Sequence, residues 1–598
     1  MLKINFQEIP FSIAGSFLKI QAVSASNSRR AQIATSSKFS PALMGADAYS
    51  HDFYEIALYK GDREITYTTN SLPWKLSLQS TEGQAIFTLA EPDTFVFEAD
   101  GLDIVLIPCK ASANKVIQPG GDVELFDYAA STHHSARAGV ATTLICTESV
   151  TSTGVKGAFA DKAYTLKFQG SPNSAGTRTS GALRFNRYGT KWPLFEIDPS
   201  KSAREVQSTF QNWMDKLPMV SEKYRETAEY AWFILWHCLA PADGELSRPA
   251  ILMSKNHMNN IWAWDICFNA LAIAKADPEM AWDQLLVFFD KQAENGMLPD
   301  HINSFESKFG FVKPPVFGWT IAKLVKILGV DASRRHLLEI FPKLVALTDW
   351  WFEYRDFDDD GMCQYHHGND SGWDNSTAFD QGYPTEGADL AAHLTLQMET
   401  LSSIAEILGL SEESEYWKLR SKQQLDSLLK MGVADGRFIS PLDSTSTSTT
   451  AGTALKTQSL LNYIPLVLGH RLPTEMAKTL MADLSPGGSF LTEFGLATEA
   501  VDSPKYEPDG YWRGPIWAPS TYLIFDGLAD IGVNGKADID INSSSKELAL
   551  AVAERFCDMC VLQPEMYENF DALTGKGLRC PGYSWTAAVF ILLAEWIG

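Results

Sequence analysis

The chain lacks the features of nucleic-acid-binding and membrane proteins. Asp and Glu number 73 against 50 Lys and Arg, for a formal net charge of -23, whereas phosphate backbones and anionic bilayers both attract basic surfaces. No apolar run approaches the roughly 18 residues of a membrane span. The N-terminus, MLKINFQEIPFS, lacks the basic start and apolar core of a signal peptide. We therefore expect a cytoplasmic protein with neither nucleic-acid nor membrane partners.

Cysteine is also scarce, with eight residues scattered along 598. The CxxC of Cys557 and Cys560 has no second pair nearby, so we predict two reduced core thiols rather than a metal site. The phosphate-loop pattern GxxxxGK[ST], the dinucleotide pattern GxGxxG, the zinc pattern HExxH and the serine elbow GxSxG are missing. The sequence therefore does not predict a phosphate loop, a dinucleotide site, a HExxH zinc site or a catalytic serine elbow.

The pattern of apolar residues along the chain changes near residue 205. Strand-like segments at 93–108 and 163–170 are separated by turns rich in Gly, Asn and Ser, which predicts an N-terminal β-sandwich domain over residues 1–205. From 206 to 598 apolar residues recur at helical spacing. This pattern predicts twelve helices, near 224–239, 262–275, 279–294, 317–328, 336–354, 388–408, 412–431, 455–469, 473–484, 515–532, 545–562 and 584–597.

The links between these helices alternate in length. Links from even-numbered to odd-numbered helices are mostly short, whereas links from odd to even helices run to about 20 to 30 residues, a length that is usually functional. If successive helices are antiparallel, all the long links emerge at one end. We therefore predict that residues 206–598 form an all-α (α/α)6 barrel, with six inner and six outer helices and the long loops around one mouth.

The long loops hold the unusual residues of the chain. Carboxylates, tryptophans and amides gather there, and GNDSGWDNS (368–376) has no apolar period, so it is interpreted as a solvated loop or a functional site rather than as the buried face of a helix. Hydrolysis of a glycosidic bond needs one carboxylic acid and one carboxylate. Aromatic faces and polar side chains bind the sugar. The motifs are NNIWAWDICF (259–268), ENGMLPDHI (294–302), KPPVFGW (313–319), HHGNDSGWDNS (366–376), YWRGPIW (511–517) and YENFD (567–571).

Four of these pieces, SGWDNS (371–376), KPP (313–315), YWRGPIW and ENFDALTG (568–575), resemble glycoside hydrolase family 63. That family, whose clan includes trehalase, contains inverting (α/α)6-barrel enzymes such as processing α-glucosidase I and its bacterial relatives. The resemblance implies an exo-acting α-glucosidase of small oligosaccharides, with Asp374 as general acid and Glu568 as general base. An inverting pair stands about 6.5–9.5 Å apart. The pKa of the acid should be raised, and Asp370 is a candidate like-charge neighbour.

Further residues are predicted to bind substrate. By resemblance, Trp264 and Asp265 hold the sugar where cleavage occurs, and the other candidate contacts are Lys313, Trp373, Asn375, Trp512, Arg513 and Trp517. Structural alternatives stay open at several positions. Trp512 and Trp517 could pack inside the barrel, Arg513 could brace a loop through a carboxylate, and Asp265 could cap a helix.

The metal content and the substrate also leave alternatives. RDFDDDG (355–361) resembles a calcium loop through Asp356, Asp358 and Asp360, but His367 stands where a bidentate Glu belongs, so an acidic turn is favoured. The reaction requires no cofactor and no metal. Trehalose-type substrates, glucosylglycerate and mannosylglycerate are alternatives. The absence of Arg from 366–387 argues against trehalase, whereas Lys313 and Arg513 leave glycerate open. A non-catalytic glycan-binding protein is the alternative from another class.

Overall fold

The computed structural model describes residues 2–23, 30–36, 51–108, 123–127, 132–137, 140–146, 150–154, 164–168, 171–173, 176–186, 198–442, 458–534 and 539–598. The chain divides into two compact units. The first comprises Met1–Leu217, Phe233–Asn260 and Asn303–Glu306, and the second comprises Pro218–Trp232, Ile261–Ile302 and Ser307–Gly598. Helix α2 (Pro199–Met214) spans residue 205. Among the described residues, no helix combines the length and the apolarity needed to cross a bilayer.

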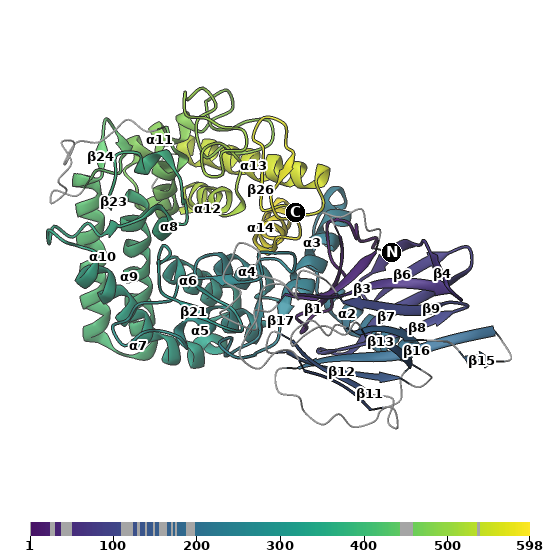
Figure 1. The fold of residues 1–598 in the computed structure, drawn as a ribbon. Coiled ribbons are helices and arrows are strands. Elements are labelled where there is room, and N and C mark those ends of the chain that lie inside the picture. Colours follow the sequence, from purple (N-terminus) through teal and green to yellow (C-terminus); the bar gives the residue numbers. More distant parts are fainter. Residues whose placement is uncertain are drawn as a thin grey trace. The chain divides into compact units, whose positions relative to one another are not determined.

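The first unit is built on two antiparallel sheets, which agrees with the β-rich N-terminal region expected from the sequence (Figure 1). One sheet has the order β1 (Leu18–Ala22), β2 (Ala31–Thr35), β3 (His51–Lys60), β9 (Asp103–Pro108), β14 (Tyr164–Phe168) and β13 (Val150–Gly154), and β4 (Arg63–Ile65) pairs with β3. The other has the order β10 (Val123–Asp127), β11 (Thr132–Arg137), β12 (Val140–Cys146), β16 (Gly176–Asn186), β8 (Thr94–Asp100), β7 (Gly83–Glu91), β6 (Lys75–Ser80) and β5 (Thr68–Leu72), and β15 (Ser171–Asn173) pairs with β16.

Aromatic side chains join the two sheets. The ring of Phe97 in β8 meets the ring of Phe168 in β14 edge-on, with centroids 5.0 Å apart. Both are buried, so each sheet presents an apolar face to the other. Gly181 in β16 leaves room for this contact, because a Cβ there would lie 2.5 Å from the Phe97 ring.

The second unit is helical, as expected, and six of its helices contact one another in a closed order. We call them the ring helices: α4 (Asp265–Ile273), α6 (Phe317–Leu328), α9 (Ala388–Leu408), η4 (Leu460–Arg471), α12 (Ala518–Asn534) and α14 (Ser584–Ile597). Each contacts the next, and α14 contacts α4. Every residue of α4 is buried. A helix enclosed on all sides is apolar all round, and this explains the composition of α4.

The remaining long helices of this region lie outside the ring helices (Figure 1). These flanking helices are α5 (Pro278–Phe289), α7 (Val330–Tyr354), α10 (Ser411–Met431), α11 (Thr474–Asp483) and α13 (Ile539–Leu562), whereas α3 (Arg225–Cys238) is divided between the two units. In α10 the buried residues are few, Trp417, Ser421, Gln424 and Leu428. Their spacing marks one face that packs on α9, while the rest of the helix meets solvent.

The predicted alternation of short and long links is confirmed. Gly329 alone separates α6 from α7, and two residues separate α9 from α10. Long links lead from flanking helices into ring helices: residues 355–387 join α7 to α9, and residues 484–517 join α11 to α12. Each long link therefore ends at the N-terminus of a ring helix. Short strands pair within these links: β17 (Leu239–Ala240) with β18 (Ala250–Ile251), β20 (His301–Ile302) with β21 (Ser307–Lys308), β22 (Gln364–Tyr365) with β23 (Thr385–Glu386), β24 (Val433–Ala434) with β25 (Arg437–Phe438), and β26 (Asn569–Phe570) with β27 (Gly577–Leu578). β19 (Ile261–Trp262) pairs with β20 and so joins two links.

Several helix predictions need correction. α5 ends at Phe289 rather than at residue 294, α7 begins at Val330 rather than at 336, and α13 begins at Ile539 rather than at 545. The helix expected at 455–469 is the 3-10 helix η4, and residues 455–457 lie outside the described part of the chain. Pro465, which has no N–H to donate, and Gly469, at φ 58°, prevent a regular α-helix there. The helix expected at 262–275 begins only at Asp265, because Ile261 and Trp262 pair with β20. The prediction of core thiols is confirmed: Cys557 and Cys560 are free and buried.

Candidate active site

The first four residues of GNDSGWDNS form a largely buried turn of helix, which corrects the interpretation of this segment as unable to form a buried helical face. Helix α8 (Gly368–Ser371) begins after His367, whose ring accepts a hydrogen bond from the Asn369 amide, and it ends at Gly372 with φ 73°. A Cβ on Gly372 would lie 2.6 Å from the Trp264 ring. Glycine at that position therefore lets the loop close directly onto the tryptophan.

Asp370 holds this loop in place. Its carboxylate accepts hydrogen bonds from the backbone amides of Val312 (3.1 Å) and His366 (3.0 Å), and it pairs with the Arg355 guanidinium at 2.8 Å. The side chain is buried and neutralised. Asp370, the candidate like-charge neighbour of Asp374, is not among the groups that shift the pKa of Asp374, whereas Asp300 raises it.

Asp374 follows the turn and faces charged neighbours. Burial raises the pKa of its carboxyl, and the charge of Asp300 raises it further. Lys313, a hydrogen bond from Tyr511 and the charge of His367 act in the opposite direction. The Tyr511 hydroxyl donates to Oδ2 of Asp374 at 3.3 Å. Asp374 has no salt bridge within the described part of the chain, so its charge is not directly neutralised.

Glu568 precedes strand β26 and is almost completely enclosed, with 5% of its surface exposed. Burial raises the pKa of its carboxyl to about 7, while the Arg579 charge and a hydrogen bond with the Cys580 backbone act in the opposite direction. The charge of Asp374 raises this pKa, so the two carboxyl groups lie within electrostatic reach of each other. The backbones of Phe570 and Ile516 exchange two hydrogen bonds, which fasten this link to the YWRGPIW segment.

The tryptophans predicted to bind sugar form one cluster. Trp512 and Trp517 stack in parallel with centroids 3.9 Å apart, and Trp512 also meets Trp373 at 4.6 Å and Trp264 at 6.1 Å. All four are nearly inaccessible in this structure. For Trp512 and Trp517 this geometry matches the packing role that the sequence left open.

Asp265 lies at the first turn of α4. Helix capping does not explain it, because the residue at the N-cap is Trp264, without a side-chain cap bond. Burial raises the pKa of Asp265 well above its ordinary value, the charge of Lys313 lowers it, and Asp300 and Asp374 raise it again. One carboxylate oxygen, Oδ2, is buried without a hydrogen-bond partner among the described residues. Such an oxygen is suited to accept a ligand hydroxyl.

Lys313 is held by Asp300 rather than by the candidate acid. Its ammonium lies 2.7 Å from Asp300 Oδ1 and donates to the Asn369 carbonyl at 2.7 Å. His301 also contacts Asp300, at 2.8 Å. Burial favours protonation of Asp300, yet the hydrogen bond with His301 and the charge of Lys313 bring its pKa below the ordinary value. Lys313 therefore acts on Asp374 and Asp265 through its charge.

Asn375 and Arg513 brace two long links against each other. Asn375 Oδ1 accepts from the Trp512 amide at 2.9 Å, and its Nδ2 donates to the Gly510 carbonyl at 3.0 Å. Arg513 donates to the Asn375 carbonyl at 2.7 Å and pairs with Asp380 at 2.6 Å. The carboxylate-braced loop left open for Arg513 is the arrangement observed.

Comparison with known proteins identifies the family. Residues 258–586 match the model of the mannosylglycerate hydrolase MGH1-like glycoside hydrolase domain. The chain belongs to this family. A mannosylglycerate hydrolase of Thermus thermophilus is 25% identical over 406 residues, which is 55% of this chain and 92% of that protein.

Solved structures support the same assignment for the fold. A family 63 mannosylglycerate hydrolase of Thermus thermophilus, in complex with Tris and D-glycerate, superposes with a TM-score of 0.50 at 22% identity and covers 62% of this chain and 99% of that one. A bacterial glucoamylase in complex with acarbose gives 0.53 at 12% identity and covers 100% and 96%. The protein is a glycoside hydrolase of family 63, as its motifs indicated.

Three residues of the glycoside hydrolase site were not predicted. Tyr511 has φ 64°, a left-handed conformation that is unusual for a tyrosine and aims its hydroxyl at Asp374. Arg579 lies over the Tyr511 ring at 5.0 Å and lowers the pKa of Glu568. Asp300 holds Lys313. Tyr511 and Asp300 stood within motifs already noted, whereas no local signal marked Arg579.

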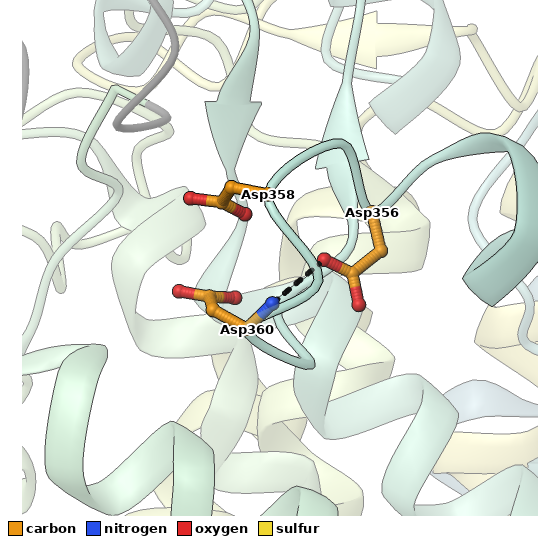
Figure 2. A group of neighbouring side chains, drawn as sticks. All are labelled: Asp356, Asp358 and Asp360. Atoms are coloured by element: carbon orange, nitrogen blue, oxygen red, sulfur yellow. Dashed lines mark hydrogen bonds between the residues drawn. The ribbon is translucent and has the colours of Figure 1, made fainter.

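The acidic segment after α7 forms a tight turn. Carboxylate oxygens of Asp356, Asp358 and Asp360 lie within 4.8 Å of one another (Figure 2). Asp356 accepts hydrogen bonds from the amides of Asp360 (3.2 Å) and Gly361 (3.0 Å). These bonds are those of the acidic turn that the sequence favoured, and calcium binding here stays a prediction.

Proposed function

We propose that this glycoside hydrolase cleaves α-glycosidic bonds of short, neutral glycosides from one end, with inversion, using Asp374 as general acid and Glu568 as general base. In this proposal the ring and flanking helices form an (α/α)6 barrel, and the N-terminal sheets form a β-sandwich. The observation that carries the proposal is two carboxyl groups, without salt bridges in the described residues, that share Tyr511 as a neighbour; the charge of Asp374 also raises the pKa of Glu568.

The electrostatics suit an acid and a base that work together. The charge of Asp374 opposes ionisation of Glu568, so the pair retains one proton over a wider pH range than isolated carboxyl groups. A singly protonated pair is the state that inverting hydrolysis requires. The protonated member gives its proton to the leaving oxygen, and the ionised member removes a proton from the attacking water.

Tyr511 is proposed to orient the acid. Its hydroxyl donates to Asp374 Oδ2, which favours protonation of the carboxyl on the other oxygen. Burial raises the pKa of Tyr511 well above its ordinary value, and the charges of Asp374, Glu568 and Asp265 add to that effect. The phenol therefore stays protonated and acts only as a donor. Asp265 Oδ2 would accept a hydroxyl of the sugar beside it.

The pairing of Lys313 and Arg513 with carboxylates favours a neutral substrate. Lys313 is already paired with Asp300, and Arg513 with Asp380. A glycerate carboxylate would have to share these groups. Hydrolysis of a hexosylglycerate is nonetheless the second candidate, because the relative from Thermus thermophilus is a mannosylglycerate hydrolase.

The decisive experiment supplies α-linked glucose disaccharides, trehalose, glucosylglycerate and mannosylglycerate, and follows the newly formed anomer by proton NMR. We expect the β-anomer to appear first from a neutral α-glucoside. Initial release of the α-anomer would refute inversion, and faster cleavage of a hexosylglycerate would favour the second candidate. Binding without turnover across the panel would support a glycan-binding protein instead.

No cofactor is proposed. Carboxyl groups alone supply the acid and the base, so treatment with EDTA should leave turnover of the cleaved glycoside unchanged. The same treatment tests the acidic turn at 356–360, since loss of a structural calcium would lower the melting temperature.

A further inference from the structure

A cavity lies at the ends of the ring helices opposite to the candidate active site. It is a cavity of about 730 Å³, and every ring helix contributes to its wall. Trp585, near the start of α14, belongs to the tryptophan cluster of the candidate active site, whereas Trp596, near the end of the same helix, lines this cavity. Eleven helical steps of 1.5 Å put the two positions about 16 Å apart along the axis.

Aromatic rings occupy the space between the two ends. Phe268 contacts Trp264 on the side of the carboxyl groups, with centroids 6.2 Å apart. It also contacts Trp319 at 6.0 Å and Tyr522 at 6.2 Å, and both of these line the cavity. The cavity is therefore a site of its own rather than an extension of the candidate active site.

Flat apolar surfaces form part of the cavity wall. Trp319, Tyr522 and Phe525 are buried side chains that line it, and Trp596 is 44% exposed at its edge. Trp596 meets Phe525 edge-on, with rings 85° apart and centroids separated by 4.9 Å. An indole fixed in this way presents apolar surface against which the C–H face of a sugar ring can stack.

The polar groups of the wall are held in fixed positions. Asp526 accepts from the indole N–H of Trp319 at 2.8 Å and pairs with Lys323. Arg471 pairs with Glu399 at 2.6 Å. The lining contains four cationic residues, Lys275, Lys323, Lys326 and Arg471, and four anionic residues, Glu399, Asp526, Asp530 and Glu595. Since the charges balance, the cavity does not select an ion of either sign.

We propose that this cavity is a second, non-catalytic binding site for a neutral mono- or disaccharide. Its volume lies within the range of about 300–1,000 Å³ that is typical of small-ligand pockets. The cavity matches the two kinds of surface on a sugar. Its aromatic rings suit the C–H faces, and its carboxylate, ammonium and guanidinium groups suit the hydroxyl groups. A charged ligand would face a wall in which cationic and anionic residues are equal in number.

The test uses the full chain labelled with 5-fluorotryptophan, in a Glu568→Gln background that suppresses turnover. Fluorine NMR follows Trp596 and Trp319, whose resonances are assigned by their loss in Trp596→Phe and Trp319→Phe. Titration with glucose and with maltose should shift both resonances saturably. Absence of a saturable shift with both sugars would overturn the proposal, as would tighter binding of glucose 6-phosphate or glucosamine.

A matched pair of variants locates the site. Trp596→Ala should weaken binding at least tenfold, with the Trp319 resonance as reporter. Leu562→Ala removes a comparably exposed apolar side chain from the end of α13 and should leave the affinity unchanged. Equal affinities in the two variants would contradict the assignment. Failure of the catalytic proposal has a different signature, namely turnover that persists in the Glu568→Gln protein.

Discussion

The two ends of the ring helices use the same kinds of residue in different ways. At the N-terminal ends, Asp265, Asp374 and Glu568 are enclosed among tryptophans, and no salt bridge neutralises them within the described chain. At the C-terminal ends, Asp526 and Glu399 also stand near aromatic rings, but each is paired with a cation. Pairing therefore distinguishes these three carboxyl groups from Asp526 and Glu399, and also from Asp370 and Asp300 at their own end, which are paired with Arg355 and Lys313.

This difference has a physical basis. A buried carboxylate without a cation costs free energy in its charged form, so its pKa rises toward the range in which proton transfer is efficient. A paired carboxylate keeps its charge and contributes a fixed hydrogen-bonding position. The first arrangement suits chemistry, and the second suits recognition or structure.

The largest expected effect is on turnover, through the carboxyl groups at the N-terminal ends of the ring helices. Asp374→Asn and Glu568→Gln should each lower kcat by about 10³-fold, because general acid and general base catalysis typically contribute 10²–10⁴-fold each. Steady-state kinetics on the cleaved glycoside measure this loss. Glu279→Gln, which removes one member of an exposed pair with Arg335, is the matched control and should change kcat less than twofold.

The second effect tests a neutralised carboxylate at the same end. Asp370→Asn removes the charge that pairs with Arg355 and should lower the free energy of unfolding by about 3 kcal/mol, since Arg355 is then left without its buried counter-ion. Urea denaturation measures the change. A loss below about 1 kcal/mol would mean that Asp370 does not hold the loop.

The third effect is a stability gain that depends on pH. The pKa of Glu568 is about 7 in the folded chain against an ordinary value of 4.5, so the folded state holds its proton more tightly and stability falls as pH rises through that window. Glu568→Gln removes this cost and should stabilise the protein by about 2–3 kcal/mol at pH 8 but hardly at pH 4. Denaturation at both pH values measures the difference, and an equal effect at both would exclude a buried charge as its cause.

The fourth effect concerns the pH profile. Arg579 lowers the pKa of Glu568, so Arg579→Met should raise that pKa and keep the proposed base protonated to higher pH. At pH 6 we expect kcat/KM to fall roughly threefold to tenfold, with recovery as the pH increases. Arg579→Lys retains the charge and should stay closer to the original profile. A uniform loss at every pH would indicate a packing role for Arg579.

The smallest expected effect is a change in stability at the C-terminal ends of the ring helices. Glu399→Gln breaks a partly exposed pair with Arg471 and should lower the free energy of unfolding by less than about 1 kcal/mol. Its pH dependence should be weak, in contrast with Glu568→Gln. A large, pH-dependent change at Glu399 would remove the distinction between the two ends.

Much of the fold could be predicted from the sequence, because the period of the apolar residues and the lengths of the links are local properties. The 3.6-residue apolar repeat located most of the helices, and α6 and α14 begin and end at the predicted residues. The failure at η4 has a local cause as well, since Pro465 and Gly469 override the apolar pattern there. The motifs likewise indicated which links carry Asp374 and Glu568.

Distinguishing Asp370 from Asp374 required the folded chain. The two residues stand four positions apart in one polar segment, yet Asp370 meets Arg355 and two backbone amides whereas Asp374 meets Tyr511. Arg355 and Tyr511 come from distant parts of the chain, and sequence spacing carries no information on which carboxylate each will reach.

The amino-acid sequence by itself determined the helical and strand-forming regions, the alternation of links and the family, because these follow from local periodicity and short motifs. Only the tertiary structure decided which charges are paired and that Arg579 and Asp300 shift the pKa values of Glu568 and Asp374. It also decided that a cavity lies at the C-terminal ends of the ring helices. Electrostatic pairing depends on distances between residues far apart in the chain, and those distances exist only after folding.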